Sequence, residues 1–332
     1  MAILQYILLF VRCANILGYN LLPEQSQQFS SESESPDSLF GWSLLAWHGQ
    51  TIVGAPGQDG AGAVHACNHT SLQCSEIVLH QDVTLPQSGF FGSALVGDEF
   101  DLYACAPLAY LDAYRVSKQT TGICYKEISG TFREFAEFNL KSSGRSRLGN
   151  RPTGATQAWY WGGIFGFSAT VINEVLYIGV PTQSLKTSDG PVLTGNVVGI
   201  DQKDMILTDP LYANFATGVE KIDGDSLLAG ETIGKGVFYE EGFQMIVSSV
   251  KAESFHGKVF ICGECFKDSR ARSLLGEKQN IEVVGKHIGE RFGKSTVACD
   301  LTGDGFDDLL VGAPLGSTSN MNLTLEKFSY TS

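Results

Sequence analysis

The sequence has few basic residues and lacks the familiar catalytic motifs. It contains 23 Lys and Arg against 36 Asp and Glu, so its formal net charge is −13. This balance disfavours nucleic acids and anionic membrane surfaces as partners and is compatible with cation binding. The sequence contains no Gly-x-Ser-x-Gly, no phosphate loop and no His-Glu-x-x-His, which are typical of hydrolases and nucleotide-binding enzymes. We therefore predict that the chain is not an enzyme.

Long apolar runs are also scarce. None approaches the roughly 20 residues that a membrane-spanning helix needs, so no direct membrane span is expected in this chain. The apolar run at residues 2–11 is followed by Arg12 and by the small residues Ala14 and Gly18. No Lys or Arg precedes the run, but the pattern otherwise favours a secretory signal peptide at residues 1–18. We therefore expect entry into the secretory pathway.

The eight cysteines are compatible with an oxidising compartment. Cys13 lies in the predicted signal peptide. In the rest of the chain, Cys67 and Cys74 close a short loop, and Cys105 and Cys124 close a longer one. We therefore predict these two disulfides.

Three further cysteines and two Asn-x-Thr sequences bear on the same compartment. Cys262 and Cys265 form a C-x-x-C sequence, which favours a local disulfide or two free thiols over a redox centre. Zinc would require a second such pair, and the sequence has none. Cys299 stands alone among strand residues and is interpreted as a small buried apolar group. The two Asn-x-Thr sequences predict glycosylation at Asn68 and Asn322.

A repeated phrase organises the chain. It consists of an apolar residue and Gly, a short apolar strand, a turn, and a second strand that ends in a sequence such as Gly-Ala-Pro. Five copies open at Phe40-Gly41, Phe91-Gly92, Phe165-Gly166, Ile233-Gly234 and Phe292-Gly293. The opening Gly lies 13 residues before the closing small residue in the first four copies and 19 residues before it in the fifth. This register predicts paired strands joined by short turns, which in the first three copies lie at His48-Gly49, Gly97-Asp98 and Asn173-Glu174.

Another strand-like run follows each closing sequence but the last, at residues 62–67, 122–125, 195–200 and 257–262. Each repeat is thus predicted to form a small antiparallel sheet, with repeats starting near residues 39, 90, 164, 232 and 291. A single such sheet cannot bury both of its faces, so neighbouring sheets must stack, and the long period favours blades around an axis. We predict an all-β fold of the β-propeller type over residues 19–332, with a β-sandwich as the alternative.

The fifth hairpin is lengthened by an acidic segment, Asp300-Leu301-Thr302-Gly303-Asp304-Gly305-Phe306-Asp307-Asp308. Like charges this close repel one another unless solvent or a cation separates them. Oxygen ligands at the first, third, fifth and ninth positions, with a backbone carbonyl from the seventh, suit Ca²⁺. The predicted ligands are Asp300, Thr302, Asp304, Asp308 and the carbonyl of Phe306. Asp307 is expected to point away or to support the ligands, and a solvated acidic turn is the alternative.

These residues resemble the FG-GAP repeats of integrin α subunits. The segment RFGKSTVACDLTGDGFDDLLVGAPLG (residues 291–316) is similar to the calcium-bearing repeat of that family, and FGWSLLAWHGQTIVGAPGQDGAGAVHACN (residues 40–68) is similar to its first blade. Tyr19-Asn20-Leu21 resembles the start of mature integrin α chains, which places signal cleavage after Gly18. The disulfide-bearing second blade of that family is similar to Cys105-Ala106-Pro107 followed by Gly122-Ile123-Cys124-Tyr125.

The resemblance implies a seven-bladed propeller, of which this chain holds five repeats as an N-terminal fragment or a truncated product. It also implies pairing with an integrin β subunit at the cell surface, binding of extracellular matrix ligands through the upper loops, and a structural Ca²⁺ on the opposite face. An aspartate typical of RGD-binding subunits is missing from Ala229-Gly230-Glu231-Thr232, and Tyr239-Glu240-Glu241-Gly242 replaces a calcium loop in the fourth repeat. The pattern is most similar to that of insect position-specific α subunits.

The sequence also contains one aromatic loop. Trp159, Tyr160 and Trp161 precede the third repeat, where they would either anchor a ligand or partner or pack against a neighbouring blade.

Two alternative functions are open. The first alternative function is a soluble or non-functional truncated propeller. The second is the accessory propeller of a secreted hydrolase with FG-GAP repeats, but such an enzyme needs a separate zinc-bearing catalytic domain, for which this chain has no room.

Overall fold

The computed structural model describes residues 29, 36–81, 85, 88–111, 119–120, 122–134, 145–147, 157–159, 164–182, 184–187, 190–193, 195, 197–201, 230, 232–238, 242–262 and 281–316. Within these ranges the regular structure is mostly β-strand, and its helical segments are η4 (Pro36–Ser38), η5 (Gln58–Gly60) and α2 (Ala252–Phe255). The prediction of an all-β fold is confirmed. Among the described segments, no helix has the length and apolar character needed to cross a membrane.

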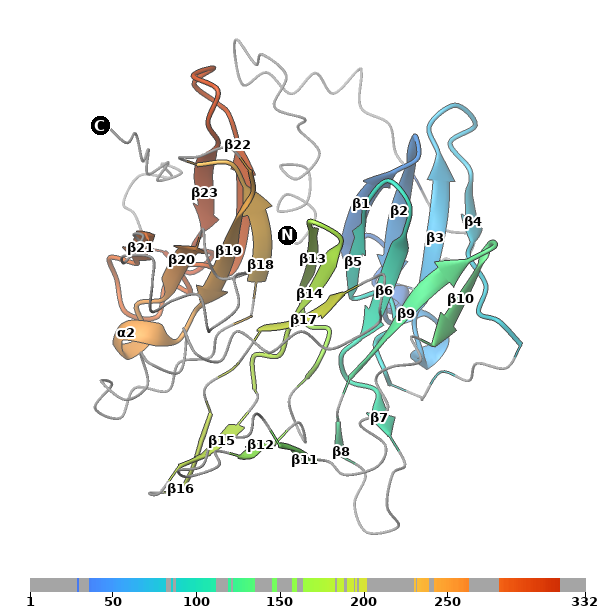
Figure 1. The fold of residues 1–332 in the computed structure, drawn as a ribbon. Helices are drawn as coiled ribbons and strands as arrows, with labels where there is room; N and C mark the ends of the chain where they lie inside the picture. Colours follow the sequence, from blue (N-terminus) through green and yellow to red (C-terminus); the bar gives the residue numbers. More distant parts are fainter. Residues whose placement is uncertain are drawn as a thin grey trace. The chain divides into compact units, whose positions relative to one another are not determined.

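The chain divides into two compact units, and the first comprises residues 1–142 and 164–167. It contains two four-stranded antiparallel sheets and a small strand pair (Figure 1). The first sheet has the order β1 (Ser43–Trp47), β2 (Gln50–Ala55), β3 (Ala63–Asn68), β4 (Cys74–Glu76). The second has the order β5 (Ala94–Gly97), β6 (Leu102–Ala106), β9 (Ile123–Ile128), β10 (Thr131–Glu134), and the pair is β7 (Tyr110–Leu111) with β8 (Gln119–Thr120).

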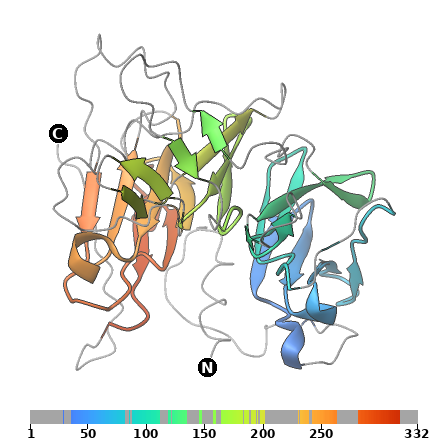
Figure 2. The same cartoon turned by 90° about the horizontal axis from the view of Figure 1, so that it is seen from below.

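The second unit comprises residues 143–163 and 168–332. Three of its sheets follow the predicted repeats: β13 (Ala169–Ile172), β14 (Val175–Gly179), β17 (Val197–Asp201); β18 (Thr232–Gly236), β19 (Gln244–Ser249), β20 (Lys258–Cys262), β21 (Ile281–Val284); and β22 (Ser295–Cys299), β23 (Asp308–Gly312). A further sheet consists of β11 (Arg145–Arg147), β12 (Gln157–Trp159), β15 (Ser184–Thr187), β16 (Gly190–Leu193). The strands β18 and β22 lie side by side, as both views show (Figure 1, Figure 2).

The predicted hairpins form, with one change of turn. Trp47 pairs with Gln50 and Ile172 pairs with Val175, so two-residue turns lie at His48-Gly49 and Asn173-Glu174 as predicted. In the second repeat, Gly97 is the last paired residue and pairs with Leu102, so the turn is Asp98–Asp101 and not Gly97-Asp98. The side chain of Asp98 stabilises this longer turn, because it accepts hydrogen bonds from the N–H groups of Phe100 and Asp101.

The same hydrogen bond closes four of the five hairpins, and it corrects the register of the fourth repeat. The opening Gly N–H donates to the closing carbonyl at 3.1 Å, from Gly41 to Gly54, Gly92 to Cys105, Gly230 to Ser248, and Gly293 to Gly312. Thr232, which lies two residues after Gly230, pairs with Ser248. The prediction that Gly234 opens this hairpin with a 13-residue spacing is therefore wrong, because Gly230 opens it and the spacing is 18 (248 − 230). Ala229 precedes Gly230, whereas Ile233-Gly234 matched the apolar-Gly phrase by chance.

Consecutive repeats are joined by a recurring contact. The hydroxyl two residues after an opening Gly donates to the carbonyl of the next opening Gly, from Ser43 to Gly92 (2.6 Å), Ser168 to Gly230 (2.9 Å), and Thr232 to Gly293 (3.1 Å). In three repeats, the Gly just before the third strand meets the Phe that opens the next repeat. A Cβ would lie 1.9–2.3 Å from that residue's carbonyl oxygen at Gly62, Gly122 and Gly257. The repeated phrase thus encodes the packing between repeats as well as the hairpin within each.

Apolar clusters fill the spaces between consecutive sheets. In the first unit, Ile52 and Val64 of the first sheet pack with Phe91, Leu102 and other apolar residues of the second repeat. The second strand of the second and fourth repeats is buried on both faces, as all five residues of β6 and all six of β19 are buried. This is why these strands have apolar runs instead of an alternating pattern. Stacking of consecutive sheets within each unit is the blade packing of a β-propeller.

Candidate functional site

The acidic segment of the fifth repeat is the loop of a two-stranded hairpin. Strand β22 ends at Cys299, which pairs with Asp308 at the start of β23, so residues 300–307 form the loop. Residues 301–306 are exposed, Asp300 and Asp307 are half-buried, and Asp308 is 9% exposed. The apolar side chains of Leu301 and Phe306 are 39% and 46% exposed, so burial does not hold this loop in place. Its order must come from polar contacts.

Asp300 is the centre of the first turn of this loop. Its Oδ1 accepts hydrogen bonds from the N–H groups of Gly303 (2.6 Å) and Asp304 (3.2 Å), and its Oδ2 accepts one from Gly305 (3.0 Å). These bonds lower the pKa of the Asp300 carboxyl, with the largest contribution from the Gly305 N–H, although partial desolvation opposes them. Asp300 is therefore held in its charged form.

Asp308 organises the other end of the loop. Its Oδ2 accepts hydrogen bonds from the N–H groups of Leu301 (2.9 Å) and Thr302 (3.2 Å). Asp304 accepts one from Phe306 N–H (3.0 Å). The carboxylates of the first, fifth and ninth positions therefore all bond to the loop backbone and curl it on itself.

The donor set of this loop fits a hard divalent cation. Every predicted ligand is an oxygen, as Ca²⁺ prefers. An ionised carboxylate has about four acceptor positions, so the two or three N–H bonds of Asp300 and Asp308 leave acceptor capacity for a cation. Within the described part of the chain, no three His, Cys, Asp or Glu side chains converge as a metal cluster. The five calcium ligands therefore remain a prediction that rests on the chemistry of the loop residues.

Asp307, which the sequence predicts either to point away or to support the ligands, contacts the fourth repeat. Its Oδ2 accepts a hydrogen bond from Val237 N–H (2.7 Å), and its own N–H donates to the Val237 carbonyl (2.6 Å). Val237 follows the end of β18, so this pair of bonds ties the acidic loop to the preceding sheet. No sequence pattern predicts this contact, because it depends on how two hairpins pack together.

The cysteine predictions have mixed outcomes. The disulfides Cys67–Cys74 and Cys105–Cys124 are both present, as predicted. The interpretation of Cys299 as an unpaired apolar group is wrong, because Cys299 is also disulfide-bonded. Its partner is none of these four cysteines.

Other predicted sites are only partly within the described residues. Asn68 ends β3 and is exposed, and its side-chain oxygen accepts hydrogen bonds from the N–H groups of Thr70 and Ser71. Trp159 ends β12. The remaining predicted residues lie outside the described residues: the signal peptide, Tyr160, Trp161, Cys265 and Asn322.

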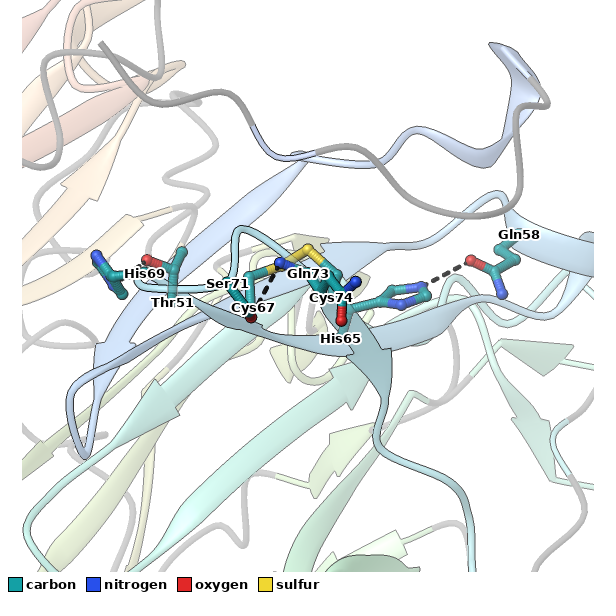
Figure 3. The surroundings of a disulfide bond; sticks show 8 residues. All are labelled: Thr51, Gln58, His65, Cys67, His69, Ser71, Gln73 and Cys74. Carbon is teal, nitrogen blue, oxygen red and sulfur yellow. Dashed lines mark hydrogen bonds between the residues drawn. A yellow bond between two sulfur atoms is a disulfide. The ribbon is translucent and has the colours of Figure 1, made fainter. Parts of the chain in front are cut away.

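A buried polar chain lies beside the first disulfide and was not predicted. His65 on β3 is 6% exposed, and its Nε2 is 2.8 Å from Gln58 Oε1 (Figure 3). Gln58 in turn donates from Nε2 to Glu76 Oε2 at 3.1 Å. The ring of Phe40, which opens the first repeat, packs edge-on against the His65 ring. Burial lowers the pKa of His65, although the charge of Glu76 opposes this shift.

This histidine predicts a loss of stability in mild acid. The unfolded chain takes up a proton near pH 6.5, whereas folded His65 does so only at lower pH. Between those two pH values the unfolded state binds more protons, so the free energy of unfolding must fall as the pH falls through this window. We expect the thermal midpoint of the wild type to drop more steeply below about pH 6.5 than that of His65→Gln, which does not titrate. Parallel pH profiles for the two proteins would contradict a neutral buried His65.

Comparisons with known proteins place these features in a family context. The family model for the FG-GAP repeat matches residues 292–322, which include the acidic hairpin. The chain is 28% identical to integrin alpha ina-1 of Caenorhabditis elegans over 241 residues, which cover 70% of this chain and 19% of that protein. It is 26% identical to integrin alpha-8 of Gallus gallus over 338 residues, which cover 91% of this chain and 30% of that protein.

An insect protein is also similar. The chain is 25% identical to integrin alpha-PS5 of Drosophila melanogaster over 300 residues, which cover 84% of this chain and 28% of that protein. The chain thus contains one segment that matches the FG-GAP repeat, and its antiparallel sheets are consistent with the blades of a β-propeller. Its similarity to integrin α subunits extends over most of the chain, which spans about a fifth to a third of the length of these relatives. The relatives are named as integrin α subunits and not as enzymes, in agreement with the prediction of a non-enzymatic chain.

Proposed function

We propose that this chain forms part of the ligand-binding head of an adhesion receptor of the integrin α type. In this proposal it enters the secretory pathway, pairs with an integrin β subunit and binds extracellular matrix proteins. The observation that carries the proposal is the repeated contact between the Ser or Thr hydroxyl of one repeat and the opening Gly carbonyl of the next. It provides a physical basis for the sequence similarity, because the residues that match the integrin phrase are those that join the repeats.

Coexpression tests this function. The chain, with a C-terminal tag, is produced in secretory cells with each integrin β subunit of its source organism, and the material recovered through the tag is probed for the β subunit. We expect one or more β subunits to co-purify and to reach the cell surface together with the chain. An unrelated secreted propeller with the same tag is the matched control. Secretion of the chain without any β subunit would favour the soluble alternative, and intracellular aggregation would favour a non-functional product.

The second part of the proposal is a structural Ca²⁺ in the fifth repeat. The ligands would be Asp300, Thr302, Asp304, Asp308 and the Phe306 carbonyl. The ion would neutralise the crowded carboxylates and hold the exposed loop, which has little burial of its own. Since Asp307 binds Val237, stiffening this loop would also stabilise its contact with the fourth repeat.

Calcium removal should reveal the site. At a free Ca²⁺ concentration about 100 times the Kd, binding adds about 2.7 kcal/mol to the free energy of unfolding. We expect this Ca²⁺-linked gain in the wild type, measured by calorimetry with and without EDTA, and its loss in Asp304→Ala. Asp307→Asn is the matched control, since it removes a charge from the same loop but not a ligand, and should keep the gain. Equal shifts in wild type and Asp304→Ala would defeat the assignment.

A further inference from the structure

The corrected register aligns the loop of the fourth repeat with the acidic loop of the fifth. Thr232 pairs with Ser248 as Ser295 pairs with Gly312. Four residues further along each hairpin, Gly236 pairs with Gln244 in the fourth repeat, and Cys299 pairs with Asp308 in the fifth. Gln244 therefore stands at the position of Asp308, the last of the proposed calcium ligands.

The two side chains make the same hydrogen bond at this position. Asp308 Oδ2 accepts from the N–H of Leu301, the second residue of its loop, at 2.9 Å. Gln244 Oε1 accepts from the N–H of Phe238, the second residue of the other loop, at 2.6 Å. Gln244 is only 3% exposed, so its amide must be satisfied by the protein.

The Gln244 amide makes a second bond that a carboxylate cannot make. Its Nε2 donates to the Gly242 carbonyl at 3.1 Å. Gly242 lies two residues before Gln244, as Phe306 lies two residues before Asp308. The carbonyl of Phe306 is the proposed backbone ligand of the cation, so in the fourth repeat an amide N–H faces the equivalent carbonyl.

The first ligand position shows the complementary change. Val237 directly follows the paired Gly236, as Asp300 follows Cys299, and a valine offers no side-chain oxygen. The first ligand position of the fourth loop therefore lacks the side-chain oxygen that Asp300 offers to Ca²⁺ in the fifth. We infer that the carboxamide of Gln244 takes, in the fourth repeat, the place that the cation takes in the fifth, and holds this loop closed without metal.

This arrangement gives the amide-held loop a role toward its neighbour. Val237, in the loop that Gln244 closes, bonds through both its N–H and its carbonyl to Asp307 of the acidic loop. The fourth loop is thus a metal-independent support against which the calcium loop is ordered. The inference that the Gln244 amide takes the place of a cation rests on the calcium site proposed for the fifth repeat. The closure of the fourth loop by Gln244 does not rest on that site.

Hydrogen–deuterium exchange of the whole secreted chain, read by mass spectrometry on peptides of the two loops, separates these claims. In the wild type we expect exchange across residues 238–244 to be equal, within about twofold, in Ca²⁺ and in EDTA, whereas Val237 N–H, which bonds to Asp307 of the calcium loop, is excluded from this comparison. Exchange across residues 300–307 should slow in Ca²⁺. Gln244→Leu, which removes both amide bonds, should speed exchange of residues 237–244 at least tenfold in both solutions. Gln244→Glu keeps the acceptor and the volume but loses the donor, and should speed exchange in EDTA if Gln244→Leu does not fold.

Two results would overturn the inference. One is calcium-dependent protection of residues 238–244 in the wild type, which would mean that a cation does bind the fourth loop. The other is unchanged exchange in both Gln244 variants, which would mean that the amide does not hold it. Failure of residues 300–307 to respond to Ca²⁺ would instead remove the calcium proposal, and the amide closure would then be judged on the fourth loop alone.

Discussion

Gly122→Ala is expected to destabilise the first unit by roughly 3–5 kcal/mol, because it adds backbone strain to a severe steric overlap. Gly122 has φ of +77°, and a Cβ at this position would lie 1.9 Å from the carbonyl oxygen of Phe165. That atom is backbone in the opening phrase of the next repeat, so it cannot move aside as a flexible side chain can. Phe165, which is buried in the first unit, would therefore have to move away from Gly122.

Gly130→Ala is the matched control for this variant. Gly130 has a similar φ of +83°, but nothing lies within 4 Å of a Cβ added there. It should therefore cost only the strain, about 1–2 kcal/mol. Urea unfolding of both variants measures the difference. If Gly122→Ala is no less stable than Gly130→Ala, the close approach of Gly122 and Phe165 does not matter, and the proposed packing between repeats is wrong.

Removal of the disulfide Cys105–Cys124 is the second large effect expected. The residues are 19 apart in the sequence, and the loop-entropy relation gives about 3 kcal/mol for a ring of this size. Both cysteines are fully buried. A Cβ at Gly166, which opens the third repeat, would lie 3.0 Å from Cys124 Sγ, so the sulfur atoms occupy the space beside that Gly. Replacing both cysteines with alanine should therefore also leave a small cavity there.

The disulfide Cys67–Cys74 provides the comparison. Its residues are only 7 apart, so the same relation gives about 2.5 kcal/mol, and Cys74 is partly exposed. Thermal unfolding of the two double-alanine variants should show the larger loss for Cys105 and Cys124. A larger loss for Cys67 and Cys74 would mean that packing against Gly166 adds nothing to the longer disulfide.

Much of the fold could be predicted because the repeats are local in sequence. An opening Gly, an apolar strand, a turn and a closing small residue lie within about 20 residues of one another, so their spacing reports a hairpin directly. The same reasoning found Cys105 and Cys124, which lie opposite each other on paired strands β6 and β9. It failed at Gly230, because Ala229 is smaller than the Phe that opens the other repeats, and Ile233-Gly234, four residues later, fitted the 13-residue spacing by chance.

The acidic loop shows a different division. Its oxygen-rich sequence indicated a candidate cation loop, and the family model includes it. The sequence did not indicate that Asp307 bonds to Val237, or that Gln244 stands at the position of Asp308. Both depend on the register of a hairpin more than 50 residues earlier in the chain, which has no counterpart in local spacing.

By itself, the sequence determined the all-β class, the hairpins of the repeats and the resemblance to integrin α subunits, because strand, turn and closing residues recur at short and nearly constant intervals. Only the tertiary structure decided which Gly opens the fourth repeat, which hydroxyl meets which carbonyl, and that a buried amide closes the fourth loop. Those features arise where one repeat packs against the next, and steric fit and hydrogen-bond satisfaction across that boundary select the register that sequence spacing alone leaves ambiguous.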